Sequence, residues 1–182
     1  MFELDRLRDE LARITQRGIG MPIAGMIFWL AAAFAESRLS ANSAALFAFF
    51  ATGIVFPMGW AITRLLGGDL MHKGHPLTSL GMLLNFVQLF YWPILIAIFA
   101  IRPSLVPFVM SCLFGSHFLA YGWLYRSRGY TTLGIAGPTA ATILQVLTPV
   151  HSNVAIPATT AIVYLIAAVL LHGENRRQLA TA

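Results

Sequence analysis

Four polar side chains lie deep inside apolar segments, where hydrogen-bonding and ionisable groups are uncommon. Asn85 and Gln88 are three residues apart in one segment, and His117 and Tyr121 are four apart in the next. Both spacings place the two side chains on one face of a helix. An imidazole can take up and release a proton near physiological pH, so His117 could do acid–base chemistry. If the two segments form an antiparallel hairpin, all four groups meet inside the protein at similar depth, near the middle of a membrane.

Two interpretations of this group stay open. In the first, the four side chains line a pathway or a binding pocket for a small molecule or an ion, because an ionisable group in mid-membrane is a functional hypothesis by default. In the second, they are interhelical hydrogen bonds, which contribute roughly 0.6–2 kcal/mol each between membrane helices. We weigh the second slightly higher for Asn85 and Gln88, and the two equally for His117.

Three charged residues lie near the expected outer ends of apolar segments. Glu36 and Arg38 follow the first apolar segment, and Arg102 occupies a very short link between two others. They could form an ion-paired outer mouth to a pathway. The alternative, which we favour, is that they are anchors at the level of the lipid headgroups.

The sequence assigns no catalytic residue, no metal and no cofactor. His72 and His75 have a ligand-like spacing, but a zinc site needs three or four ligands. A bis-histidine haem needs two deep histidines, and His117 is the only one that lies deep in a segment. A retinal Schiff base needs a lysine within a segment, and the single lysine, Lys73, lies in a loop. No nucleophile elbow, phosphate loop, HExxH motif or carboxylate pair is found. Whether the protein is an enzyme stays uncertain, and we favour that it is not.

Six apolar segments must position these residues. The hydrophobic fraction is 58% and the charged fraction 10%, against roughly a quarter charged in a soluble domain. Each segment approaches or exceeds the ~20 residues needed to cross ~30 Å of hydrocarbon. The sequence therefore predicts an all-α fold with six transmembrane helices: Ile19 to Ala35, Ser43 to Leu66, Leu77 to Ile101, Ser104 to Tyr125, Thr131 to Val150 and Val154 to His172. Short links predict that consecutive segments pair as three hairpins.

An amphipathic helix is expected before the first segment. Leu4, Leu7, Leu11 and Ile14 form one apolar stripe, and charges of both signs fill the other face. Such a helix lies on the membrane surface or packs under the bundle. The expected organisation is this helix over residues 1–17, the bundle over 18–173 and a cytoplasmic tail over 174–182.

The positive charges predict the orientation. With the N-terminus in the cytoplasm, the outer links hold only Arg38 and Arg102. The inner segments then hold the other cations: Arg6, Arg8, Arg13, Arg17, Arg64, Lys73, Arg126, Arg128, Arg176 and Arg177. This asymmetry follows the positive-inside rule and places both termini in the cytoplasm. The expected location is a cell membrane, the inner membrane if the source is bacterial. Tyr121, Trp123, Tyr125 and Tyr130 are expected to form an interfacial aromatic belt.

A set of loose motifs resembles a known family. These motifs are Phe56-Pro57, Leu65-Leu66-Gly67, His75-Pro76-Leu77, Pro93, Arg102-Pro103, Tyr121 to Tyr125, Tyr130 and Leu133-Gly134. Over about residues 20 to 140 the chain resembles a family of small bacterial multi-span membrane proteins, catalogued as domain of unknown function 7010. In that family an Asn often precedes the Pro-Leu pair, whereas His75 stands here. The resemblance implies a compact helical membrane fold and no assigned activity.

The sequence thus favours an integral membrane protein with a small-molecule or ion pathway or pocket lined by Asn85, Gln88, His117 and Tyr121. The alternative is a structural or accessory subunit without a site of its own. The expected partners are the lipid bilayer and a small-molecule or ion ligand. Self-association is left open, and the position of the cations at segment ends argues against nucleic acid.

Overall fold

The computed structural model describes residues 2–149 and 151–180, and every regular element in those residues is helical. An amphipathic helix and a short 3-10 turn precede the long helices, as the stripe of leucines predicts. The elements are α1 (Phe2–Ile14), η1 (Gln16–Gly18), α2 (Gly20–Arg38), α3 (Ala41–Leu65), α4 (Thr78–Phe86), η2 (Val87–Tyr91), α5 (Trp92–Ile101), η3 (Pro103–Leu105), α6 (Val106–Ser116), α7 (Phe118–Leu124), α8 (Arg128–Leu147) and α9 (Ser152–Ala180).

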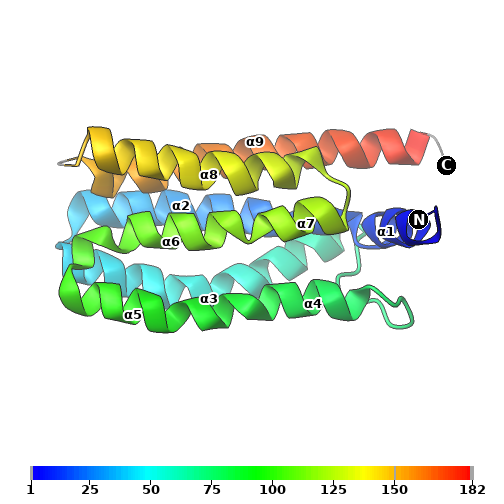
Figure 1. The fold of residues 1–182 in the computed structure, drawn as a ribbon, viewed down its shortest axis with the longest axis horizontal. Helices are drawn as coiled ribbons and strands as arrows, with labels where there is room; N and C mark the ends of the chain where they lie inside the picture. Colours follow the sequence, from blue (N-terminus) through cyan, green and yellow to red (C-terminus); the bar gives the residue numbers. More distant parts are fainter. Residues whose placement is uncertain (1, 150, 181–182) are drawn as a thin grey trace.

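Five helical segments of the described chain are long and apolar enough to cross a membrane: Gln16–Arg38, Ala41–Leu65, Thr78–Ile101, Pro103–Leu124 and Ser152–Gln178. The sixth expected segment lies in α8, whose Thr, Gly and Gln residues make it less apolar; its expected end, Val150, lies outside the described residues. With 20 residues, α8 is about 30 Å long and runs along the bundle beside α9 (Figure 1). The count of six spans therefore stays a prediction, whereas a multi-helix membrane fold is supported.

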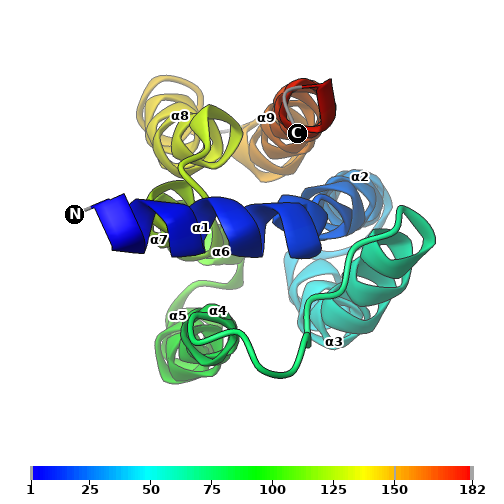
Figure 2. The same ribbon diagram turned by 90° about the vertical axis from the view of Figure 1, so that its right-hand side faces the viewer.

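The long helices lie side by side, and α1 crosses their ends. Figure 1 shows α8 and α9 in one layer, α2 with α6 and α7 in the next, and α3 with α4 and α5 in the third. Figure 2 looks along the bundle and shows α1 lying across one end of it. Leu11 and Ala12 of α1 are buried there, so the apolar stripe of α1 faces the bundle. The expected tail does not leave the bundle as a separate segment, because α9 continues as a helix to Ala180.

Small residues bring the central helices together. Gly20 of α2 is so close to α3 that an added Cβ would lie 2.2 Å from the carbonyl oxygen of Gly59. Ser111 and Gly115 of α6, whose spacing predicts close packing, meet different helices: Ser111 Oγ is 2.8 Å from Thr160 Oγ1 of α9, and Gly115 faces Pro138 of α8. Close approach of this kind is typical of membrane helices, which lack a hydrophobic drive between them.

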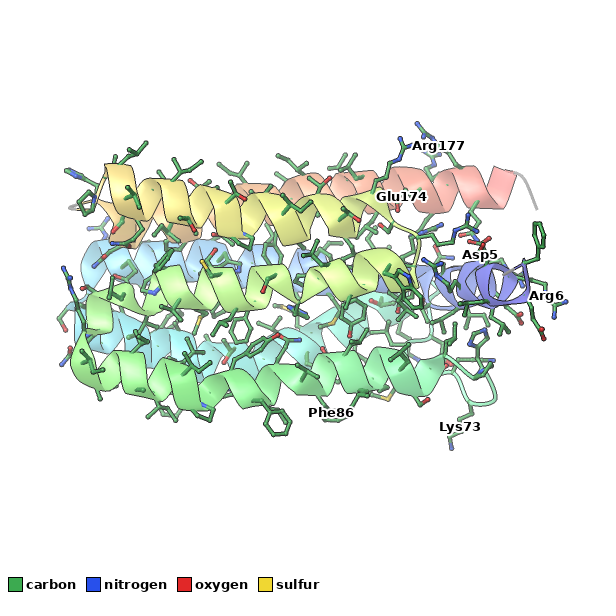
Figure 3. The ribbon with its side chains drawn as sticks, viewed as in Figure 1. Asp5, Arg6, Lys73, Phe86, Glu174 and Arg177 are labelled. Carbon is green, nitrogen blue, oxygen red and sulfur yellow. The ribbon has the colours of Figure 1, made fainter. Side chains whose placement is uncertain are left out.

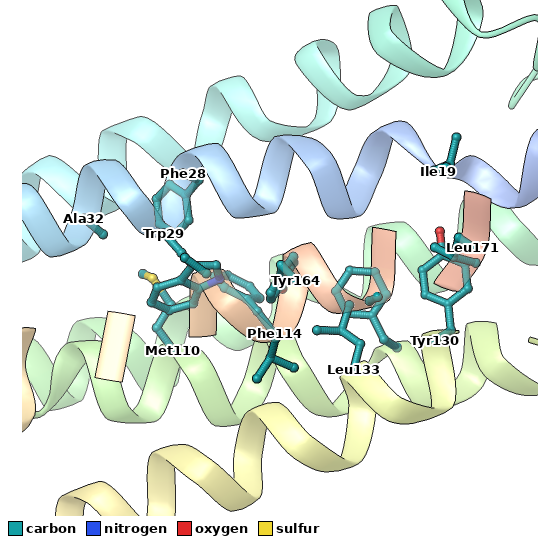
Figure 4. Close-up of a cluster of buried hydrophobic side chains, with 14 of the residues drawn as sticks. Ile19, Phe28, Trp29, Ala32, Met110, Phe114, Tyr130, Leu133, Tyr164 and Leu171 are labelled. Atoms are coloured by element: carbon teal, nitrogen blue, oxygen red, sulfur yellow. The ribbon is translucent and has the colours of Figure 1, made fainter. Parts of the chain in front are cut away.

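The buried core lies between α2, α6, α8 and α9. Figure 4 shows Trp29, Met110, Phe114, Leu133 and Tyr164 gathered between these helices. The segment from α4 to α5 is different, because Leu95 is its single buried residue. Of the three expected hairpins, α2–α3 and α8–α9 are closely packed, whereas α4–α5 is only loosely attached to α6–α7. This loose attachment leaves space beside the predicted site.

Candidate functional site

His117 occupies a break between two helices. It stands between the end of α6 at Ser116 and the start of α7 at Phe118. Its Nδ1 atom is 2.6 Å from the carbonyl oxygen of Phe114. A carbonyl oxygen can only accept, so Nδ1 carries the proton of the neutral ring and Nε2 is the acceptor. Within the described chain Nε2 has no hydrogen-bond partner. His117 can therefore accept a hydrogen bond from a ligand or a water.

Tyr121 lies in α7 and connects this helix to α4. Its hydroxyl donates to the carbonyl oxygen of Gly81 at 2.8 Å. The His117 and Tyr121 rings meet edge to face, with centroids 5.8 Å apart. Tyr121 thus holds the loosely packed α4 at a fixed position beside His117.

Asn85 and Gln88 form a pair on the facing segment. Gln88 Nε2 donates to Asn85 Oδ1 at 3.2 Å. Neither Asn85 Nδ2 nor Gln88 Oε1 has a protein hydrogen-bond partner in residues 2–149 and 151–180. One amide donor and one amide acceptor thus stay available. The expected pairing of these two side chains is present, and the pair still has hydrogen-bonding capacity toward a ligand.

Three adjoining cavities lie around these residues. An inner cavity of about 40 Å³ below α1 is lined by Asn85, His117 and Tyr121 among others. A middle cavity of about 60 Å³ is lined by Gln88 and His117, with Phe28, Trp29 and Tyr164 on the far side. A groove of about 490 Å³ lies between α3 and the α4–α5 segment and is lined by Asn85, Gln88 and Trp92. The three cavities adjoin, because neighbouring ones share lining residues such as Asn85, Gln88 and His117, and each of the four residues predicted from the sequence lines at least one of them.

Both facing helices depart from regular α-helix at this level. The segment from α4 to α5 passes through the 3-10 turn η2, which contains Gln88, and α6 passes to α7 at His117. Asn85 lies seven residues after the start of α4, and His117 seven residues before the end of α7, about 10 Å in each case. Asn85 and His117 are therefore about equally far from the α1-side ends of their segments, and η2 follows Asn85 at the middle of Thr78–Ile101. Interrupted membrane helices are tolerated where they line a cavity.

A buried aromatic cluster closes the inner cavity toward α1. Phe118 and Tyr130 stack with their centroids 5.4 Å apart, and Tyr125 lies 5.8 Å from Tyr130. Tyr125 and Tyr130 are almost fully buried, so their expected place in an interfacial belt is wrong. Trp123, by contrast, is exposed and lies 4.4 Å from the guanidinium of Arg8.

An ionic cluster that the sequence did not indicate fixes the same end. Arg17 Nη1 donates to Asn175 Oδ1 at 2.6 Å, and Arg17 Nε lies 3.6 Å from Glu174 Oε2. The other carboxylate oxygen of Glu174 accepts from the backbone N–H groups of Arg128 and Gly129 at the start of α8. A carboxylate at a helix N-terminus is favourable. Figure 3 labels Glu174 on α9, toward the end of the bundle where α1 lies. The cluster joins η1, α8 and α9.

The charged residues of the expected outer mouth are not joined by ion pairs in the described part of the chain. Among the ion pairs of the described residues, none links Glu36 to Arg38 or Arg102. Arg38 instead lies over the ring of Phe34 at 5.7 Å. At the opposite end, His72 lies 3.7 Å from Asp69. The described part of the chain holds no group of three or more potential metal ligands.

Comparisons with known proteins place the chain in a family without giving it an activity. No curated protein and no solved structure matches it. One family model matches residues 4–174, a longer range than the motifs between residues 20 and 140 indicate. With almost the whole chain matched, the resemblance is confirmed: the protein belongs to the family of unknown function DUF7010.

Proposed function

We propose that this protein binds a small molecule within the membrane, in the region where the inner cavity, the middle cavity and the groove adjoin. The observation that carries the proposal is the meeting of two helix breaks, at η2 and at His117, around polar atoms without protein partners in the described chain. Discontinuous membrane helices commonly form substrate sites. A purely structural hydrogen-bond pair would leave neither a ligand-sized groove nor unpaired polar atoms beside it.

A binding pocket is favoured over a pathway through the membrane. The three cavities are lined by residues from the α1 end and from the middle of the bundle. Of the described residues lining them, none is Glu36, Arg38 or Arg102, which lie near the other end. These linings favour a pocket that opens sideways between α3 and α4–α5.

Native mass spectrometry of the gently purified protein tests this proposal. We expect a discrete bound mass in the wild type that is lost in His117→Ala, because the ligand loses its acceptor on α6–α7. His172→Ala is the matched control, since His172 is exposed on α9, and it should keep the bound mass. Spectra without a bound mass in the wild type, or with equal retention in His117→Ala, would refute the pocket.

The alternative function is an accessory subunit. The observation in its favour is the α4–α5 segment, where Leu95 is the single buried residue and large apolar side chains such as Leu83 and Phe90 are exposed. Lipid can cover such a surface as well as a partner protein can. A stoichiometric partner chain recovered from native membranes, together with an empty pocket in the same preparation, would favour this alternative.

We propose that the chain crosses a cell membrane six times, with both termini in the cytoplasm. Support comes from the start of α1 and the end of α9, which lie at the same end of the bundle (Figure 1), and from Arg6, Lys73 and Arg177 at that end (Figure 3). Because five other helical segments of the described chain are candidate spans, an even number of crossings requires that α8 also crosses the membrane. A fluorescent protein fused to the C-terminus should fluoresce, and an alkaline phosphatase fused there should be inactive. Active phosphatase would show that the C-terminus faces outward. This result would contradict six crossings that begin from a cytoplasmic N-terminus.

A further inference from the structure

The groove opens toward the lipid. It lies between α3 and the α4–α5 segment, and it is lined on both sides by large apolar residues that include Phe50, Phe86 and Leu89. All three of these side chains are more than half exposed. In a bilayer this surface faces acyl chains. A volume of about 490 Å³ falls within the range of small-molecule sites. The geometry favours a ligand that enters from the membrane and carries a flexible apolar part.

The lining excludes a charged ligand. None of the described residues that line the inner cavity, the middle cavity or the groove is Asp, Glu, Lys or Arg. A carboxylate, phosphate or ammonium group placed there would be buried without a counter-ion, which is strongly unfavourable. The ligand must therefore be uncharged.

The polar atoms define the head of the ligand. His117 Nε2 requires a hydrogen-bond donor, and Asn85 Nδ2 requires an acceptor. A hydroxyl group can donate to the first atom and accept from the second, and both side chains line the inner cavity. The inner and middle cavities have about 40 and 60 Å³, room for a hydroxyl and a few waters but not for a sugar or a glycerol phosphate. The head is therefore compact.

We infer that the groove binds an uncharged single-chain lipid whose head is one hydroxyl group, a long-chain alcohol or an alkylphenol. The apolar chain lies between α3 and α4–α5, and the hydroxyl reaches the level of Asn85 and His117. This inference rests on the proposed function and adds the class of ligand. An alkylphenol would also place its ring among the aromatic side chains that line the space, such as Trp92 and Phe114.

Binding of tritiated hexadecanol to the full chain in phosphatidylcholine nanodiscs tests the inference. We expect saturable binding that unlabelled hexadecanol and nonylphenol displace. Because each lost hydrogen bond weakens binding by about tenfold, hexadecane should compete at least about tenfold less well. Hexadecyl phosphate, which is charged, should not compete. Nonylphenol competing more strongly than hexadecanol would identify a phenol as the preferred ligand.

Two glycine variants provide a matched pair. Gly53 lines the groove on α3, and an added Cβ there would meet no protein atom within 4 Å. Gly173 on α9 is equally open but lies outside the three cavities. Gly53→Leu should abolish hexadecanol binding by filling the groove, and Gly173→Leu should leave it unchanged. Both changes replace glycine within a helix by a better helix former, so loss of the fold is not expected in either.

The outcomes separate the ligand class from the pocket itself. Equal competition by hexadecane or hexadecyl phosphate, or unchanged binding in Gly53→Leu, would overturn the inference. No hexadecanol binding, together with a bound mass that His117→Ala loses in native mass spectra, would show that the pocket exists but takes another class of ligand. If the bound mass is absent as well, the proposed function itself fails.

Discussion

Gly20→Ala is expected to separate α2 from α3 and to destabilise the protein strongly, although it adds only one methyl group. An added Cβ would lie 2.2 Å from the carbonyl oxygen of Gly59 and 2.5 Å from the backbone nitrogen of Thr63. Both obstacles are backbone atoms, so no side-chain rotation relieves the contact. Separation of the helices would also break the 3.0 Å bond from the Gly20 N–H to Thr63 Oγ1. Overpacking typically costs about 1–3 kcal/mol and occasionally more, and two backbone obstacles place Gly20→Ala at the upper end of that range.

Equilibrium unfolding in mixed detergent micelles measures this loss. Gly53→Ala is the matched control, because Gly53 lies in the same helix pair and its added Cβ meets no protein atom within 4 Å. The control should be neutral or slightly stabilising, since alanine is the better helix former. A Gly20→Ala protein as stable as the control would contradict the close α2–α3 packing.

The second large effect is expected at the buried ionic cluster. Arg17→Met removes the partner of Glu174 and the donor to Asn175 Oδ1. The side chains of Arg17 and Glu174 are only 10% and 20% exposed, and a buried charge left without its partner costs about 3 kcal/mol. Glu174 keeps its bonds to the start of α8, which limits the loss. The same unfolding measurement should show a clearly lower free energy of unfolding.

Arg126→Met is the comparison for this prediction. It removes an ion pair of 3.0 Å with Asp9 whose side chains are 46% and 48% exposed, and an exposed pair contributes less than about 1 kcal/mol. The double variant Arg17→Met/Glu174→Gln should recover part of the stability, because the unpaired charge is gone. Equal losses in Arg17→Met and Arg126→Met would mean that burial does not strengthen the cluster.

The sequence predicts the helical elements well because one physical signal determines them. Lipid accepts only segments that satisfy their own backbone hydrogen bonds, so apolar runs of sufficient length become helices. The pairing of Asn85 with Gln88 follows from helical spacing alone. The span through α8 has the weakest signal, since Thr and Gly residues dilute its apolar character while packing holds it beside α9.

The remaining features depend on contacts between distant residues. Arg17 and Glu174 are brought together only by the packing of η1 against α9, and their types alone indicate surface positions. Tyr125 and Tyr130 resemble interfacial aromatics in the sequence, but α1 covers that end of the bundle and buries them. The break at η2 has a local signal, because Pro93 lacks the N–H that would bond to the carbonyl of Leu89. The groove has none, because it results from how loosely α4–α5 packs.

The ligand space between η2 and His117 is the central claim, and an experimental structure of the protein in lipid nanodiscs tests it most directly. We predict a 3-10 break at Val87–Tyr91, an open groove beside α3, and density of a non-protein molecule in contact with Gln88 and His117. A continuous α-helix from Thr78 to Ile101, packed against α3 with the groove closed, would contradict it.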